Sequence, residues 1–487
     1  MEAGLLEVPG VQLMMIRVGK LLRTALENGI NFFDTADVYG DGHSEKLTGK
    51  FTKDSTFEED DHRNFNRNGE AFDKGESIWD RFSHQEGNVL NGDTGNQACD
   101  HYNRFKEDIA LMKELNLDSY RFSISWPRIF PEGHGKVNQA GLDFYKELVD
   151  ELLKAGIEPA ITLYHWDLPQ AIQEEGGWEN RKTTDYFVEY AELLFEELGD
   201  KVKNWITHNE PWVASFLGNY FGEHAPGKND LPAAIKVAHN IMLSHGKVVK
   251  KYREMDLDGE VGITLDLHEI NPVSQSKSDV EAAELEEEFS NRWFLDPIFK
   301  AKYPDKIMNK FKDNFNLEFI GEGDMEIINQ EIDFLGINYY TRHVIEADKS
   351  HNIFDYKHVK MIGNPHTEMG WEVYPDGLYN LLINLKKEYT DKPIYITENG
   401  RASDDKVDEY GRVNDKDRID YYASHLKAVE RAIKSGVSVA GYYAWSLLDN
   451  FEWAWGYTRR FGLIYVDFET QERILKDSAK WYRQLIK

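Results

Sequence analysis

From about Arg104 to the C-terminus, short apolar runs alternate with amphipathic segments, and this alternation leaves few folds open to the chain. Between most of the runs lie helical patterns such as AGLDFYKELVDELLKAG (140–156), whose apolar residues recur at spacings of three and four and which ends at a glycine. Apolar strands joined by such helices form a parallel sheet covered by helices. The seven predicted strands are SYRFSISW (119–126), PAITLYHW (159–166), VKNWITHNEP (202–211), EVGITLDL (260–267), IDFLGINYY (332–340), PIYITENG (393–400) and VAGYYAWSL (439–447). The pattern therefore predicts an α/β fold one strand short of a closed (β/α)8 TIM barrel.

Polar and aromatic residues gather at the C-terminal ends of these predicted strands. They are His165, Asn209, Glu210, Tyr340, Glu398 and Trp445. Barrel enzymes carry their chemistry at this end of the strands, whereas the opposite ends serve stability. The arrangement therefore predicts one site built from several strand ends.

The charge balance bears on which partners the chain can have. The formal net charge is −29, which argues against nucleic acid and anionic membrane surfaces as partners, although an acidic surface can also be simply solvated.

No stretch reaches the roughly 20 apolar residues of a membrane span, and the first residues lack a signal-peptide pattern. The single cysteine, Cys99, allows no intramolecular disulfide. Together these features favour a cytoplasmic protein.

Two glutamates stand next to asparagines at strand ends, Glu210 after Asn209 and Glu398 before Asn399. Hydrolysis of a glycosidic bond needs a proton for the leaving oxygen and stabilisation of an oxocarbenium-like centre, and two carboxyl groups supply both. When they lie about 5–5.5 Å apart, the second one acts as a nucleophile and the configuration is retained. Taken singly, each glutamate could instead cap a helix or pair with an arginine.

Six motifs in order give these glutamates a context. They are YRFSISWPRI (120–129), LYHWDLP (163–169), THNEP (207–211), INYY (337–340), YITENG (395–400) and WSLLDNFEWAWGY (445–457). Over roughly residues 74–485 the chain resembles family 1 glycoside hydrolases. The resemblance implies a retaining β-glycosidase of the β-glucosidase type, acting on a small β-glycoside or short oligosaccharide with neither cofactor nor metal.

Carried over motif by motif, the resemblance makes Glu210 the general acid/base and Glu398 the nucleophile. The charge of Glu398 would then raise the pKa of Glu210 and keep it protonated until Glu398 is glycosylated. Arg121 and Tyr340 resemble groups that hold the nucleophile ionised and oriented, although a structural ion pair and a core aromatic are the alternatives. Asn209 would bind the sugar 2-hydroxyl.

The same resemblance implies a set of substrate-binding residues. His165 would bind the 3-hydroxyl, Trp445 would form a platform under the sugar, and both could instead be core residues. Glu452 and Trp453 match the group that grips the 4- and 6-hydroxyls. Trp371, Trp166, Tyr340 and Phe461 complete the expected lining. A Glu452 carboxylate would repel a 6-phosphate, which favours neutral glucosides, with galactosides and fucosides as further substrates.

The first 73 residues depart from the family. Its Gln-Ile-Glu-Gly motif is absent, and Asn66, Arg67 and Asn68 stand near the position of its sugar-binding glutamine. Residues 24–50 resemble a segment of aldo-keto reductases, which are also (β/α)8 barrels, and Asp34 and Tyr39 match two catalytic positions of that family. The chain thus resembles a recombinant of two barrel families. Its domain organisation would be one barrel over 1–487, with an atypical segment 1–73 and a glycosidase-like part 74–487.

We hypothesise that INFFDTA (30–36) supplies the missing eighth strand, after a helix at 20–29 and before an exposed charged loop at 54–76. The competing view is an extension over an incomplete barrel, whose two open edges would favour aggregation or a homo-oligomer. Loss of one hydrogen bond to substrate costs about 1–3 kcal/mol, so weak-to-normal activity is expected rather than none. A sugar-binding barrel without turnover and an aldo-keto reductase remain the alternatives.

Overall fold

In the computed structural model of the chain, the described residues are 32–34, for which only the backbone is considered, 74–350 and 353–486. The expected helix at 20–29, the reductase-like Tyr39 and the stretch Asn66–Asn68 lie outside these residues, as does most of the charged segment 54–76.

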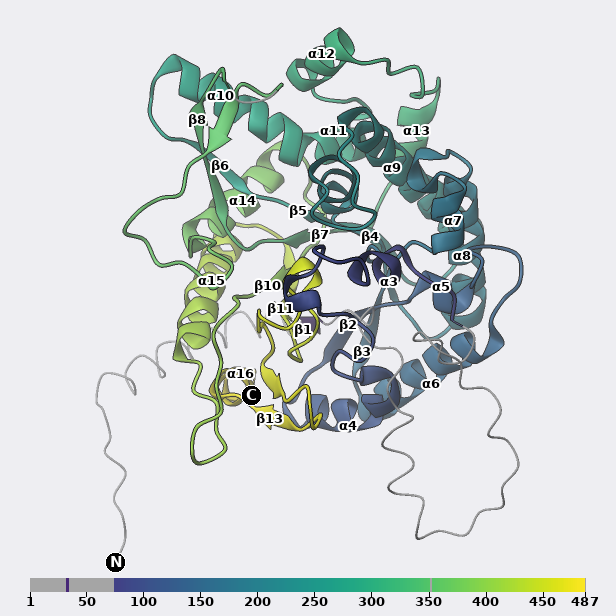
Figure 1. Ribbon diagram of the computed structural model, residues 1–487, viewed down its shortest axis with the longest axis vertical. Coiled ribbons are helices and arrows are strands. Elements are labelled where there is room, and N and C mark those ends of the chain that lie inside the picture. Colours follow the sequence, from purple (N-terminus) through teal and green to yellow (C-terminus); the bar gives the residue numbers. More distant parts are fainter. Residues whose placement is uncertain (1–31, 35–73, 351–352, 487) are drawn as a thin grey trace, which may run out of the picture.

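The described part of the chain centres on a closed barrel of parallel strands, with helices around it (Figure 1). In barrel order the strands are β1 (Phe32–Asp34), β2 (Ser119–Ser123), β3 (Glu158–Tyr164), β4 (Asn204–Asn209), β5 (Glu260–Asp266), β7 (Phe334–Asn338), β10 (Ile394–Asn399) and β11 (Val439–Trp445). The last seven coincide with the seven strands predicted from the apolar runs. Each of them is buried over nearly its whole length, as expected for a parallel sheet covered on both faces.

Strand β1 closes the barrel. Its residues pair in parallel with β11 on one side, where Asp34 is in register with Trp445, and with β2 on the other, where Asp34 is in register with Arg121. The hypothesis that residues 30–36 supply the eighth strand is therefore confirmed for 32–34. Closure leaves neither β2 nor β11 with an open edge there, which removes the main reason to expect edge-to-edge association.

A proline at Phe33 tests this closure. Proline cannot donate to the strand ladder, so Phe33→Pro is expected to leave a ladder acceptor unsatisfied and to lower the free energy of unfolding by about 1–3 kcal/mol, and the Tm with it. Thermal unfolding followed by circular dichroism measures the effect. Ile362→Pro, at a turn residue that is 98% exposed, is the matched control and should unfold like the wild type. An unchanged Tm in Phe33→Pro would show that β1 contributes nothing to the barrel.

Most helices lie on the outside of the barrel, between successive strands (Figure 1). The longer ones are amphipathic and bury one face; in α6, for example, Leu148 and Leu152 are fully buried and Gly156 ends the helix with a positive φ of 79°. The helices are α3 (Ile78–Ser83), α4 (His101–Glu114), α5 (Trp126–Ile129), α6 (Gln139–Ala155), α7 (Gln170–Glu174), α8 (Thr183–Leu198), α9 (Leu231–Glu254), α10 (Lys277–Glu287), α11 (Trp293–Lys300), α12 (Asp305–Asn314), α13 (Asp324–Ile328), α14 (Pro375–Glu388), α15 (Lys416–Lys434) and α16 (Asp477–Leu485). No helix among the described residues is both long and apolar enough to cross a membrane.

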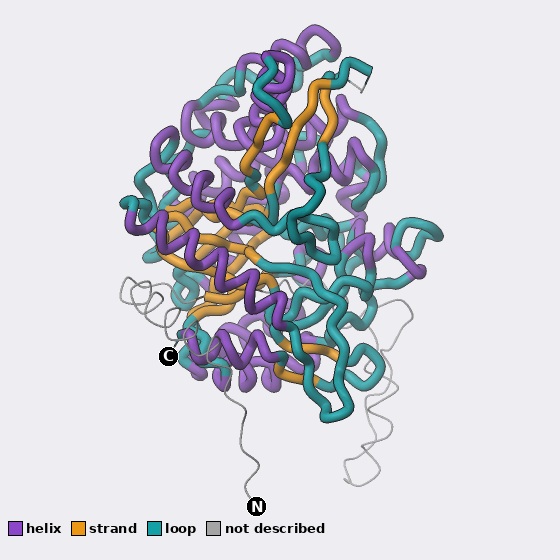
Figure 2. The backbone as a smooth tube through the Cα atoms, turned by 90° about the vertical axis from the view of Figure 1, so that its left-hand side faces the viewer, coloured by secondary structure: helices purple, strands orange, loops and turns teal. Residues whose placement is uncertain are grey.

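Two small sheets lie apart from the barrel (Figure 2). One consists of β6 (Glu269–Pro272), β8 (Arg342–Ala347) and β9 (Tyr356–His358), and the other of β12 (Ile464–Val466) and β13 (Arg473–Leu475). Strands β6 and β8 each begin within a few residues of the C-terminal end of a barrel strand, β5 and β7 respectively. The first small sheet is therefore placed at the end of the barrel where the polar strand ends meet.

Candidate active site

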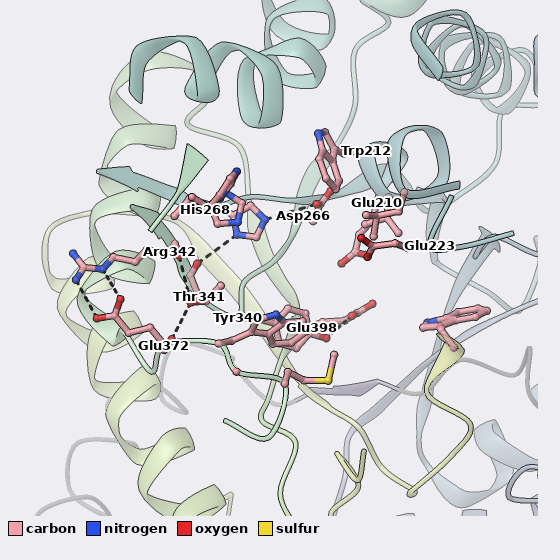
Figure 3. Close-up of a pocket in the computed structure, with 18 of the residues that line it drawn as sticks. Glu210, Trp212, Glu223, Asp266, His268, Tyr340, Thr341, Arg342, Glu372 and Glu398 are labelled. Carbon is pink, nitrogen blue, oxygen red and sulfur yellow. Dashed lines mark hydrogen bonds and ion pairs between the residues drawn. The ribbon is translucent and has the colours of Figure 1, made fainter. Parts of the chain in front are cut away.

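A cavity of about 630 Å³ opens at the C-terminal ends of the barrel strands (Figure 3). Most of the residues predicted from the sequence line it directly: His165, Trp166, Glu210, Tyr340, Trp371, Glu398, Trp445, Glu452, Trp453 and Phe461. The remaining two, Arg121 and Asn209, lie in the layer beneath, where both are buried. The structure thus brings together every site residue that the sequence predicted.

Glu398, at the end of β10, is held by two hydrogen bonds. Nη1 of Arg121 donates to its Oε1 at 2.9 Å, and the Tyr340 hydroxyl donates to its Oε2 at 2.6 Å. Burial raises the pKa of Glu398 above its usual value, although the charge of Arg121 and the hydrogen bonds from Tyr340 and Arg121 act to lower it. The carboxyl is thus fixed at both oxygens and supplied with the positive charge that favours its ionised form.

An amide and guanidinium network beneath the cavity orients Asn209. Its Oδ1 accepts from Nη2 of Arg121 at 2.7 Å and from Nδ2 of Asn338 at 3.1 Å, and its Nδ2 lies 3.2 Å from Nε2 of His165. Burial, and secondarily the charge of Arg121, hold the pKa of His165 well below its usual range, so this imidazole is neutral. Arg121 therefore positions Glu398 and Asn209 together.

Glu210 follows β4 directly and adopts a positive φ of 47°, with its backbone N–H donating to the carbonyl of Thr264 at 2.9 Å. Such a conformation is costly for a residue with a side chain and gathers at functional sites. Oε1 of Glu210 accepts from Nδ2 of Asn338 at 2.6 Å. Burial and then the negative charge of Glu398 raise the pKa of Glu210 well above its usual range. The two glutamates therefore differ in their electrostatic surroundings. The carboxyl of Glu398 lies beside the Arg121 cation, whereas the carboxyl of Glu210 experiences the negative charge of Glu398.

Glu452 lies in the cavity with one carboxyl oxygen unused. Its Oε2 is buried and has no hydrogen-bond partner within the described part of the chain. Burial, and then the charge of Glu398, raise the pKa of Glu452 to about 8. A buried polar atom without a partner is costly, so it points to a ligand group that satisfies it. At neutral pH the carboxyl is mostly protonated, which weakens the repulsion of a 6-phosphate that was expected from a full charge.

Aromatic rings form the walls of the cavity. The rings of Trp445 and Trp453 lie nearly parallel to His165, with centroids 6.1 and 5.9 Å away. Trp371 packs against Tyr340 and Phe461, with centroid distances of 5.1 and 6.2 Å. Flat apolar surfaces next to polar side chains suit the C–H faces and hydroxyls of a sugar ring.

Two site residues were not predicted from the sequence. Asn338 ends β7, contacts Glu210 and Asn209, and lowers the pKa of Glu398 through a hydrogen bond, so it links both carboxyl groups. Asp266 ends β5 and lines the cavity between Glu210 and His268 (Figure 3). Burial and the charge of Glu398 raise its pKa well above its usual range. In the sequence, Asn338 and Asp266 both stand near the C-terminal end of a predicted strand, and this position could have identified them as candidate site residues.

In its ionised form Asp266 raises the pKa of Glu210 through its charge, which gives a testable expectation for the pH range above the raised pKa of Asp266 itself. Asp266→Asn keeps the size of the side chain and removes that charge, so the pKa of Glu210 should fall. An enzyme that uses Glu210 as an acid loses activity as pH rises through that pKa. The basic limb of kcat/KM should therefore move to lower pH, while Glu223→Gln, an exposed residue in the cavity lining, should leave it in place. A limb that stays in place, or moves to higher pH, would contradict the coupling.

Comparison with known proteins agrees with this geometry. Residues 66–487 match the family model described as glycosyl hydrolase family 1, which covers far more than half of the chain. The chain belongs to glycosyl hydrolase family 1. Residues 13–68 match the model of the aldo/keto reductase family, which overlaps the start of the glycosidase match at residues 66–68. The protein is therefore a glycoside hydrolase whose N-terminal segment resembles a different barrel family.

Three relatives illustrate the family membership. A protein named beta-glucosidase A from Acetivibrio thermocellus is 52% identical over 85% of this chain and 93% of its own length. A bifunctional beta-D-glucosidase/beta-D-fucosidase from Bifidobacterium breve is 44% identical, covering 84% of this chain and 92% of that protein. Among solved structures, a family 1 β-glucosidase from Thermotoga maritima superposes with a TM-score of 0.86 at 44% identity, covering 94% of this chain and 97% of that one.

Proposed function

We propose that this chain hydrolyses terminal β-D-glucosyl residues with retention of configuration, using Glu398 as nucleophile and Glu210 as general acid/base. The observation that carries the proposal is the asymmetry between the two carboxyl groups. Arg121 and Tyr340 fix Glu398 in place and favour its ionised form, whereas burial and the charge of Glu398 raise the pKa of Glu210 and favour its protonated form. Two carboxyls whose pKa values are pushed apart are suited to opposite roles.

The reaction follows from this asymmetry. Glu398 attacks the anomeric carbon while Glu210 gives its proton to the departing glycosidic oxygen, which leaves a glycosyl ester on Glu398. Formation of the ester removes the negative charge that raised the pKa of Glu210. Glu210 can then ionise and take a proton from the water that hydrolyses the ester. Asn209, fixed by Arg121 and Asn338, is placed to bind the 2-hydroxyl, a contact that strengthens in the transition state.

The stereochemistry of the first product tests the proposal. Hydrolysis of an aryl β-glucoside, followed by proton NMR from the first seconds, should release β-glucose before mutarotation produces the α form. Early α-glucose would refute the nucleophilic role of Glu398. Binding of glucose without any turnover would instead support a sugar-binding barrel, and NADPH oxidation with an aldehyde would support a reductase.

Glu452 supports a preference for substrates with a free 6-hydroxyl. Glu452 lines the cavity, its Oε2 has no partner within the described residues, and its protonated carboxyl can both donate to and accept from a sugar hydroxyl. The named activities of the two relatives agree with glucosides as substrates; a D-fucoside lacks the 6-hydroxyl, forgoes this contact with Glu452 and is the secondary substrate. A small neutral β-glycoside or short oligosaccharide is the proposed substrate.

Glu452→Ala measures this preference. Loss of one substrate hydrogen bond is expected to lower kcat/KM for an aryl β-glucoside by roughly 5- to 150-fold, equivalent to about 1–3 kcal/mol. An aryl 6-deoxy-β-glucoside lacks the 6-hydroxyl, so the substitution should affect that substrate much less. Equal losses on both substrates would show that Glu452 does not contact the 6-hydroxyl.

For the chain as a whole we propose one barrel domain over residues 1–487, in which the segment 1–73 supplies β1 and the segment 74–487 supplies the rest. The pairing of β1 with both β2 and β11 supports this arrangement. A cytoplasmic location is part of the proposal and rests on the single cysteine, which is buried.

A further inference from the structure

A second cluster of chemically active side chains lies in the wall of the cavity, apart from the carboxyl pair. It joins Glu286 of α10, His343 of β8 and His358 of β9. One carboxylate oxygen and one ring nitrogen of each histidine all lie within 4.8 Å of one another. Figure 1 shows α10 and β8 together at the periphery, away from the barrel strands. Three separate elements therefore direct potential metal ligands at one point.

The distances within the cluster are close to those of a zinc site. Nδ1 of His343 lies 2.9 Å and Nε2 of His358 lies 3.6 Å from the same oxygen, Oε1 of Glu286. Ligand atoms on a tetrahedral Zn²⁺ with bonds of about 2.0–2.1 Å are separated by roughly 3.3 Å. These two separations lie on either side of this value, and the third, between the two ring nitrogens, is within 4.8 Å.

The carboxylate of Glu286 is held from behind. The Ser290 hydroxyl donates to Oε1 at 2.7 Å, and the Tyr356 hydroxyl donates to Oε2. Burial alone would raise the pKa of Glu286, but the hydrogen bond and charge of His343, with the hydrogen bond of Tyr356, bring it below its usual range. An ionised carboxylate fixed by further hydrogen bonds is how proteins orient metal ligands.

The open side of the cluster faces the cavity. His343 and His358 belong to the lining, with their side chains 21% and 53% exposed, whereas Glu286 is 2% exposed behind them. The ring of His268 stacks on that of His343 at a centroid distance of 3.9 Å. If the cluster were only a structural ion pair, His343 and Glu286 would be enough. The imidazole of His358, directed at the same Glu286 oxygen, is the further ligand that a metal site requires.

We propose that Glu286, His343 and His358 bind one divalent transition-metal ion of the zinc type at the mouth of the cavity. Two imidazoles and a carboxylate suit Zn²⁺ or Co²⁺ better than Mg²⁺ or Ca²⁺, which favour all-oxygen ligands. The ion takes the place of the proton shared between His343 and Glu286, which passes to solvent or to the other ring nitrogen. The fourth position, toward the cavity, takes water. Bound there, the ion ties β8 and β9 to α10.

Metal titration of the full-length protein tests the site. After removal of metals with a chelator, Zn²⁺ binding is measured by calorimetry, and Co²⁺ binding by the visible bands of a low-coordinate cobalt complex. The chain has 16 histidines, so the site is identified by the difference between variants rather than by total stoichiometry. His358→Gln and His343→Gln should each remove one binding event or weaken it by at least about 100-fold, more than the loss of an outer hydrogen-bond partner.

His366→Gln is the matched control, because His366 also lines the cavity but is not part of the cluster. It should bind Zn²⁺ as the wild type does. Unchanged hydrolysis of an aryl β-glucoside by metal-free His358→Gln would show that the variant is folded. If the wild type binds no Zn²⁺, or if both cluster variants bind it as tightly as the wild type, the site does not exist.

Discussion

Glu398→Gln is expected to lower kcat for an aryl β-glucoside by at least about 10⁴-fold. The glutamine amide is close in size to the carboxylate but is a far weaker nucleophile. The neighbouring residues that assist Glu398 cannot take over its attack on the substrate. Arg121 and Tyr340 would still contact the side chain, so the pocket should keep its shape. Steady-state kinetics measure the loss, and calorimetry with a glucose-shaped inhibitor should show binding close to that of the wild type.

Two controls sharpen this result. Glu223→Gln makes the same chemical change in an exposed residue of the cavity lining and should keep nearly full activity. A 2-fluoro β-glucoside with a good leaving group slows the second step, so the wild type should accumulate a covalent adduct on the peptide that contains Glu398. Turnover by Glu398→Gln within about tenfold of the wild type, or an adduct on another residue, would refute the assignment.

Glu210→Ala is expected to have an effect that depends on the leaving group. General acid catalysis is worth roughly 10²–10⁴-fold, so substrates with poor leaving groups, such as cellobiose, should lose about that much in kcat/KM. A dinitrophenyl glucoside needs no proton on its leaving oxygen, and its first step should be nearly unaffected. Hydrolysis of the glycosyl ester then becomes slow, because no base activates water.

Rescue by a small anion completes this test. Azide needs no general base, so it should restore turnover of the dinitrophenyl substrate by Glu210→Ala and yield the β-glucosyl azide. The basic limb of the pH profile should also disappear, since Glu210 is the group whose protonation it reports. Equal losses across all leaving groups, without rescue, would indicate that the substitution damages the fold rather than removing an acid.

The sequence predicted well those features that depend on a short stretch of residues. A buried parallel strand needs a continuous apolar run, so seven barrel strands were recognisable from residues alone, and their C-terminal ends placed Glu210 and Glu398 at one face. Strand β1 was inferred from the shortage of one strand. Its pairing with β2 and β11 depends on both neighbours, and no local pattern specifies it.

What the sequence left open depends on the environment of each side chain. The pKa of Glu452 near 8 arises from burial and from the charge of Glu398, so a carboxylate expected to be charged is mostly neutral. Asn338 and Asp266 became site residues only once the barrel placed β5 between β4 and β7. The cluster of Glu286, His343 and His358 likewise needs a helix and two strands to meet.

The closure of the barrel also has a kinetic consequence. Phe33 pairs with Ala444, about 400 positions further along the chain, so the last seam of the barrel joins nearly the first described residues to nearly the last strand. Contacts between such distant positions form late and slow folding, because the loop between them must be ordered first. During synthesis the outer edge of β1 must wait unpaired until the ribosome has released β11. Slow translation at high protein concentration should therefore favour exchange of β1 between chains. The yield of folded enzyme should then depend on chaperones more than on the stability of the finished barrel.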